Sequence, residues 1–152
     1  MTEIVRITDN KRKYMELLLL ADEQAEMIEK YLDRGEMFAL IKDREVCAVC
    51  VLTDEGGGVC ELKNIAVKPE FQRHGYGRQL IGFAVEHCRG RYARLIVGTG
   101  ESPLTVPFYE NCGFVYTHRV RGFFTENYDH PIYEAGVLLT DKVYFEMKLT
   151  EV

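Results

Sequence analysis

Long apolar runs, a surplus of basic residues and an even set of cysteines are all missing from this chain of 152 residues. No stretch approaches the ~20 apolar residues that a membrane-spanning helix needs. The net charge is −5, from 24 acidic and 19 basic residues, which gives no general attraction to nucleic acid or to an anionic membrane. We therefore expect neither as a partner, and the charge favours a small cationic or neutral molecule over a polyanion.

The cysteines indicate a reducing compartment. There are 5 of them, an odd number at scattered positions, which argues against a disulfide framework. Cys47 and Cys50 form a C-x-x-C pair, but no second pair of cysteines or histidines follows at the spacing of a zinc site. We expect free thiols in the core and no metal. Residues 1–10 are polar with mixed charge, so no leader sequence is expected and a cytoplasmic location is predicted.

The periodicity of apolar residues predicts a single α+β domain over residues 1–152. Strands are predicted at 3–8, 37–41, 46–52, 59–67, 93–97, 114–122 and 142–149, the second to fourth of these forming an antiparallel meander around a turn at 54–58. Helices are predicted at 11–32, with a break near Ala21-Asp22, and at 77–89. A third, short or late-starting helix is capped by Ser102, weakened by Pro107 and ended near Cys112-Gly113.

A glycine-rich turn, Gln72-Arg73-His74-Gly75-Tyr76-Gly77, lies between a predicted strand and a predicted helix. Free N–H groups and a partial positive charge at a helix N-terminus suit a pyrophosphate, and Arg73, His74 and Arg78 add positive charge. The P-loop pattern is absent, and the Rossmann pattern fails because Leu80 occupies its third glycine position. A tight turn without a ligand stays open as the alternative.

Two motifs together resemble those of the GNAT superfamily of N-acetyltransferases. The first is Gln72-x-x-Gly75-x-Gly77 with the preceding segment 62–71, and the second is the segment 107–114, with Tyr109 followed by Gly113-Phe114. The resemblance covers nearly the whole chain in element order. It implies a central mixed, mostly antiparallel sheet of about six to seven strands with a splayed central pair and helices on both faces. It also implies acetyl-CoA as the acyl donor and no metal.

The resemblance further implies which residues hold coenzyme A. The main chain of Gln72, Arg73, His74, Gly75, Tyr76, Gly77 and Arg78 would bind the pyrophosphate. Ile65, Ala66 and Val67, on a strand splayed from its neighbour by a bulge, would pair with the pantetheine arm. Ser102 falls where many members of the family have an asparagine that contacts the cofactor, and its hydroxyl could serve there.

Two residues carry the expected chemistry, the transfer of an acetyl group to a primary amine within a ternary complex. Tyr109 matches the usual general acid, which protonates the leaving thiolate. Glu61 is a candidate general base for the amine, acting directly or through a water. The alternatives are a core tyrosine and a solvent-facing carboxylate. A protein that lacked both roles would be a non-catalytic module that binds or senses acyl-CoA.

The acceptor side is predicted from Asn64 and from the long connection at 123–140. Aromatic and acidic residues there, including Phe124, Glu126 and Tyr128, suit a wall for a cationic amine. A surface loop or a dimer contact is the alternative for this segment, and the final strands could pair in a homodimer. A small-molecule amine is favoured over a protein acceptor, but the sequence does not identify it.

Overall fold

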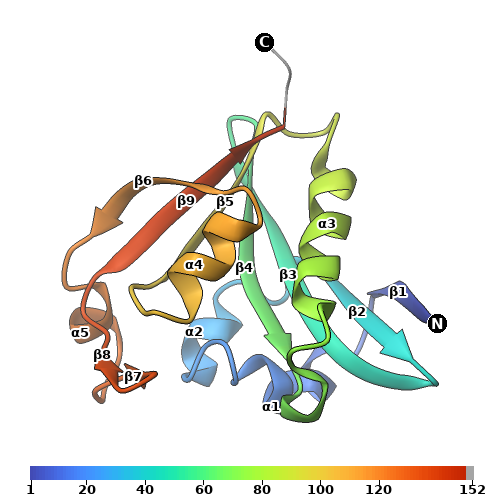
Figure 1. Ribbon diagram of the computed structural model, residues 1–152, viewed down its shortest axis with the longest axis horizontal. Coiled ribbons are helices and arrows are strands. Elements are labelled where there is room, and N and C mark those ends of the chain that lie inside the picture. The colour runs from blue at the N-terminus through green and yellow to red at the C-terminus, as the bar shows by residue number, and fades with distance from the viewer. Residues whose placement is uncertain (150–152) are drawn as a thin grey trace.

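The computed structural model describes residues 1–149 and is built on a mixed sheet of seven strands in the order β1-β2-β3-β4-β5-β9-β6 (Figure 1). Those strands are β1 (Thr2–Ile7), β2 (Glu36–Lys42), β3 (Glu45–Gly56), β4 (Val59–Val67), β5 (Arg94–Gly100), β9 (Lys142–Lys148) and β6 (Val115–Val120). All neighbours are antiparallel except β4 and β5, which are parallel. The predicted fold class is confirmed.

Helices cover both faces of the sheet. The long helix α3 (Tyr76–Cys88) and the short α4 (Thr105–Asn111) contribute to one core, which includes Leu80, Tyr109 and Phe145. The helices η1 (Lys11–Tyr14), α1 (Met15–Leu18) and α2 (Ala25–Glu29) lie on the opposite face, over a second core that contains Leu18 and Ile28. A 3-10 turn, η2 (Pro69–Phe71), links β4 to the turn before α3.

The predicted helix at 11–32 is divided into the short helices η1, α1 and α2. It breaks between Leu18 and Ala25, as the sequence suggested near Ala21-Asp22, and each piece is one or two turns long. Asp22 is a poor residue for a helix interior. Its carboxylate instead accepts hydrogen bonds from Tyr31 and Tyr128, and these tertiary bonds hold the break open.

The connection at 123–140 was predicted without regular structure, and this is wrong. It contains α5 (Phe123–Asn127) and a two-stranded hairpin of β7 (Tyr133–Glu134) and β8 (Val137–Leu138). Leu139 N–H donates to the Ile132 carbonyl over 2.8 Å, and both side chains are buried. Two apolar anchors therefore order a segment whose composition is mostly polar.

The sheet opens between β4 and β5. Their parallel pairing runs from Val59 with Arg94 to Leu62 with Val97 and ends there, although both strands continue. At the same level the β3–β4 register shifts and leaves Lys63 as the extra residue of a bulge. The bulge reverses which face each later side chain of β4 meets. In Figure 1 β9 and β6 lean away from β3 and β4 beyond this point.

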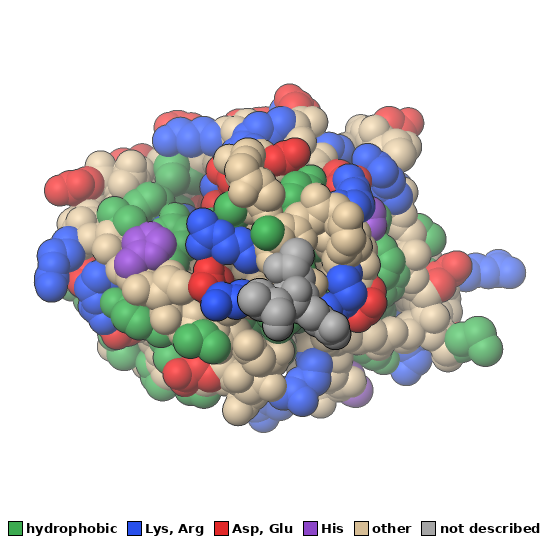
Figure 2. Space-filling view, turned by 90° about the horizontal axis from the view of Figure 1, so that it is seen from above, with side chains coloured by type: hydrophobic (Ala, Val, Ile, Leu, Met, Phe, Trp, Pro, Cys, Tyr) green, Lys and Arg blue, Asp and Glu red, His purple; other side chains and the backbone are tan. Residues whose placement is uncertain are grey.

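The cysteines and the charged side chains are distributed as the composition suggests. The five cysteines are free, and four of them are buried, as predicted. Acidic and basic side chains are interspersed on the face shown in Figure 2. Within residues 1–149, no helix has the length and apolar character needed to cross a membrane.

Candidate active site

Two hollows lie on either side of the open sheet and share two residues, Ile65 and Tyr109. The first, here the turn-side hollow, has a volume of about 420 Å³ and is lined by Ile65, Val67, Phe71, Gln72, Arg73, Gly75, Tyr76, Gly77, Arg78, Leu104, Thr105, Phe108 and Tyr109. The second, the loop-side hollow, has a volume of about 230 Å³ and is bounded by the α1–α2 break, β4, β5, Tyr109, the 123–140 connection and Lys142. Two ligands, one bound in each hollow, would meet at Tyr109.

The turn-side hollow is built for an anion by its main chain. Arg73 and Gly75 have positive φ angles of 67° and 80°, the conformation that turns successive N–H groups toward one point. The first helical bond of α3 runs from Gln79 N–H to the Gly75 carbonyl. Within residues 1–149, the backbone N–H groups of residues 73–78 have no hydrogen-bond acceptor. These free donors sit at the positive end of a helix of 13 residues.

Most of the residues predicted to hold coenzyme A line this hollow. Those that do are Ile65, Val67, Gln72, Arg73, Gly75, Tyr76, Gly77 and Arg78. Ala66 and His74 lie outside the lining. The Ala66 side chain belongs to the core on the opposite face, and the exposed His74 ring stacks on Tyr76 with centroids 5.7 Å apart. Both were predicted for their main chains, which remain beside the hollow.

Ser102 also lies outside the lining, and its hydroxyl has other partners. It accepts hydrogen bonds from the N–H groups of Leu104 and Thr105, at 3.2 Å and 3.3 Å, and donates to the Glu134 carboxylate. These are the contacts of a helix cap at the start of α4. Val106 N–H donates to the Ser102 carbonyl over 3.2 Å, and Pro107, the third residue of α4, lacks the N–H that would make the next such bond.

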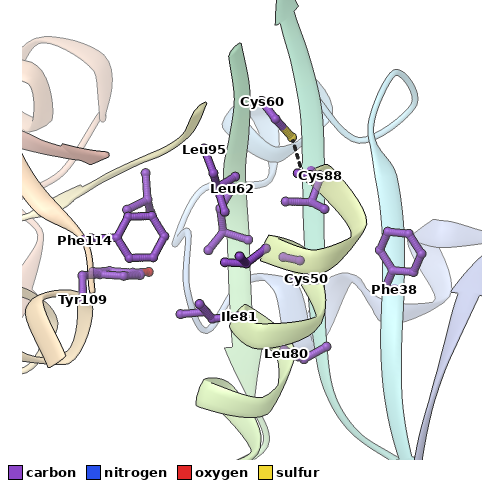
Figure 3. Packing of buried hydrophobic residues seen from close by; sticks show 14 of the residues in the cluster. Phe38, Cys50, Cys60, Leu62, Leu80, Ile81, Cys88, Leu95, Tyr109 and Phe114 are labelled. Atoms are coloured by element: carbon purple, nitrogen blue, oxygen red, sulfur yellow. Dashed lines mark hydrogen bonds between the residues drawn. The ribbon is translucent and has the colours of Figure 1, made fainter. Parts of the chain in front are cut away.

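Tyr109 stands where the two hollows meet. Its side chain is 7% exposed and is held edge-on between Phe108 and Phe114, with centroids 5.2 Å and 5.8 Å away. Figure 3 shows the phenol oxygen directed away from α4 toward β4. Burial raises the pKa of Tyr109 above its ordinary value of 10.0. The phenol therefore keeps its proton at neutral pH.

Glu61 is buried on the face of β4 opposite α3, but it does not line either hollow. Its Oε1 lies 3.3 Å from Nζ of Lys63, the bulge residue. Lys63 lines the loop-side hollow. The carboxylate thus stands one side chain behind the hollow wall, and its predicted role as base stays a prediction.

A hydrogen-bonded chain forms one wall of the loop-side hollow. Asn64 Nδ2 donates to the Leu18 carbonyl and to the Tyr31 hydroxyl, each over 3.1 Å. Asp22 accepts from the hydroxyls of Tyr31 and Tyr128, at 3.4 Å and 2.6 Å. Burial raises the pKa of Asp22. Asn64 is 3% exposed, and its Oδ1 accepts no hydrogen bond from residues 1–149.

Three of the four predicted acceptor residues, Asn64, Phe124 and Tyr128, line the loop-side hollow. Glu126 is exposed on α5 and lies outside the lining. The sequence also suggested Glu134 for this wall, and Glu134 lines the hollow, whereas Asp22 and Lys142 were missed. Strand alternation could have found Lys142, because Val143 and Phe145 face the α3 core and Lys142 must face the other way. No local signal marks Asp22, whose partner Tyr128 is 106 residues away.

Comparison with known proteins agrees with this geometry. Residues 33–116, more than half of the chain, match the family described as the acetyltransferase (GNAT) domain. The chain belongs to the GNAT family of N-acetyltransferases.

Its relatives include the uncharacterised N-acetyltransferase YvbK of Bacillus subtilis, 35% identical over 88% of each chain. Among crystal structures, a GNAT acetyltransferase from Elizabethkingia anophelis with acetyl-CoA bound is 34% identical, with a TM-score of 0.90 over 97% of this chain and 98% of that one. A Bacillus subtilis acetyltransferase in complex with CoA is 31% identical, with a TM-score of 0.91 over 99% and 100% of the two chains. These two crystal structures contain acetyl-CoA and CoA, respectively.

Proposed function

We propose that this GNAT acetyltransferase transfers an acetyl group from acetyl-CoA to the primary amine of a small molecule, directly and within a ternary complex. The observation that carries the proposal is that Tyr109, a buried phenol, is shared by two hollows of different character. A volume of about 230 Å³ on the loop side suits a small molecule better than a protein segment. Free thiols throughout the chain fit a cytoplasmic enzyme.

The turn-side hollow is the proposed donor site. The N–H groups at residues 73–78 and the side chains of Arg73 and Arg78 would bind the pyrophosphate of coenzyme A. In the described part of the chain, the strand edge at residues 65–67 has no partner strand on the β5 side. It is therefore free to pair with the amide groups of the pantetheine arm. Binding through the main chain explains why little side-chain identity is needed there.

The proposed acid acts on the leaving thiolate, and the proposed base acts on the attacking amine. The amine nitrogen attacks the acetyl carbonyl, the N–C bond forms and the C–S bond breaks. Tyr109 gives its proton to the leaving thiolate, and Glu61 takes the proton of the amine through a water. Holding both reactants at the junction supplies a large share of the rate enhancement.

An assay with a panel of amines tests the proposal. Release of the CoA thiol from acetyl-CoA would be measured with amines, amino acids, polyamines and aminoglycosides, and acetyl-CoA binding would be measured by calorimetry in parallel. We expect binding, and thiol release that depends on the amine. Tight binding without release for any amine would contradict transfer and favour the non-catalytic acyl-CoA-binding module.

A further inference from the structure

Lys142 is placed in the loop-side hollow by the register of the sheet. It is the first residue of β9 and lies opposite Gly100 on β5 and Val120 on β6. The next residue, Val143, faces the α3 core. Because side chains alternate along a strand, Lys142 faces the other side, where it lines the hollow and is half-buried.

Gly98 makes room for this lysine. A Cβ at position 98 would overlap Cε of Lys142 and would come within 2.7 Å of the Tyr144 ring. Only the absence of a side chain at this central position of β5 lets the lysine stem cross the strand. The ammonium group then lies 4.4 Å from the ring centroid of Phe123, which also lines the hollow, and 5.2 Å from that of Tyr144.

The ammonium has aromatic neighbours but, among the described residues, no carboxylate in direct contact. None of the ion pairs among residues 1–149 includes Lys142. The half-buried carboxylates of the lining have other partners, since Asp22 accepts from two tyrosine hydroxyls and Glu134 accepts from Ser102. Burial lowers the pKa of Lys142, against the raising influence of Glu61 and Asp22. A cation removed from water without a partner is costly, and a bound anion would remove that cost.

The single unpaired lysine in the loop-side hollow indicates which kind of anion would bind there. One lysine is a single point charge, whereas sites for a phosphate dianion combine several donors or an arginine fork. The other lysine of the wall, Lys63, is paired with Glu61. Beside the carboxylates, the wall also carries the rings of Phe123, Phe124, Tyr128 and Tyr133, which suit an apolar side chain. Asp22 offers a negative charge for an ammonium group in the same hollow.

We propose that the acceptor amine also carries a carboxylate, as an apolar amino acid does, and that Lys142 binds this carboxylate. The proposal rests on the proposed transfer to an amine and adds its substrate class. It narrows the cationic or neutral small molecule that the charge of the chain favours. Lys142 then acts on specificity, and Tyr109 keeps its place at the reacting atoms.

Turnover of matched acceptors provides one test. L-phenylalanine would be compared with L-phenylalaninamide and 2-phenylethylamine, and L-leucine with L-leucinamide, each on the basis of free-amine concentration. For the wild type we expect kcat/KM for the acid to exceed that for the amide by about tenfold or more, the scale of one charge-assisted hydrogen bond. Lys142→Met should remove this preference, and Lys142→Arg should keep part of it.

The control is Lys148→Met, which removes an exposed lysine from the far end of the same strand and should preserve the preference. An equal loss of turnover for acid and amide in Lys142→Met would overturn the proposal, because it would indicate a lysine that acts on the amine. A preference for the amide in wild type would overturn it as well.

Binding of the acetylated products separates this proposal from the proposed function. Calorimetry on the CoA-loaded protein would compare N-acetyl-L-phenylalanine and N-acetyl-L-leucine with their primary amides. We expect the acids to bind at least about tenfold more tightly in wild type and equally with the amides in Lys142→Met. Equal binding of acid and amide in wild type, or no binding of either, overturns the proposal. If the acids bind but no amine is turned over, the proposed acetyl transfer is contradicted, whereas the binding of a carboxylate by Lys142 is supported.

Discussion

The two hollows that meet at Tyr109 differ in what they are made of. The turn-side hollow relies on backbone N–H groups and on two short stretches of chain, residues 65–78 and 104–109. The loop-side hollow relies on side chains from β4, β5, β9, the α1–α2 break and the 123–140 connection. A ligand common to many proteins can be recognised by the main chain. A particular acceptor needs charges and rings brought together from distant positions.

The largest effect is expected where the hollows meet. Tyr109→Phe removes the proton donor but keeps the ring among Phe108 and Phe114, so turnover should fall about a hundredfold or more. The affinity for acetyl-CoA should change little. Steady-state kinetics and calorimetry measure the two quantities. Unchanged turnover, with the chemical step shown to be rate-limiting, would rule out the acid role.

A change in the turn should affect the donor side alone. Gly75→Val places a β-branched residue at a φ of 80°, which costs about 1–2 kcal/mol and displaces the anion-binding N–H groups. Acetyl-CoA affinity should fall about tenfold, while binding of N-acetyl amino acids is retained. Gly82→Ala is the matched control. It lies on the exposed face of α3, where no heavy atom of residues 1–149 lies within 4 Å of the new Cβ apart from its chain neighbours and the backbone of its own helix. It should add about 0.5–1 kcal/mol of stability without affecting binding.

Ser102→Ala tests whether the hydroxyl only caps α4 or also contacts coenzyme A. Loss of the cap on α4 should lower the free energy of unfolding by about 1 kcal/mol, measured by urea denaturation. If capping is its whole role, acetyl-CoA affinity stays at the wild-type value. A clear loss of affinity in a folded variant would instead support the contact with coenzyme A that the sequence predicts.

The smallest effect is expected from Asp22→Asn, through the pH dependence of stability. Because the pKa of Asp22 is raised above 3.8 in the fold, the native state binds its proton more tightly than the unfolded chain does. The ionised form therefore costs stability above the raised pKa, and the cost fades as the pH falls toward 3.8. The stability of the variant relative to wild type should be greatest at neutral pH and should decrease on acidification. Urea denaturation across this range measures it, and a difference independent of pH would contradict the raised pKa.

The sequence predicted the donor side better than the acceptor side. The turn at residues 72–77 and the segment around Tyr109 are local patterns, so their spacing along the chain is enough to recognise them. The acceptor wall depends on contacts such as Asp22 with Tyr128, which no local pattern encodes. Glu126 was chosen from composition alone and proved to be exposed on α5.

By itself, the sequence determined the order of the seven sheet strands along the chain, the glycine turn before α3 and the position of Tyr109, because each follows from local periodicity, glycine conformation and spacing. Only the tertiary structure decided which charges face the acceptor. The bulge at Lys63 reverses the faces of β4, and Gly98 lets the Lys142 stem cross β5. Both effects depend on strand register across the sheet, which arises from packing between distant segments and leaves no pattern in any one of them.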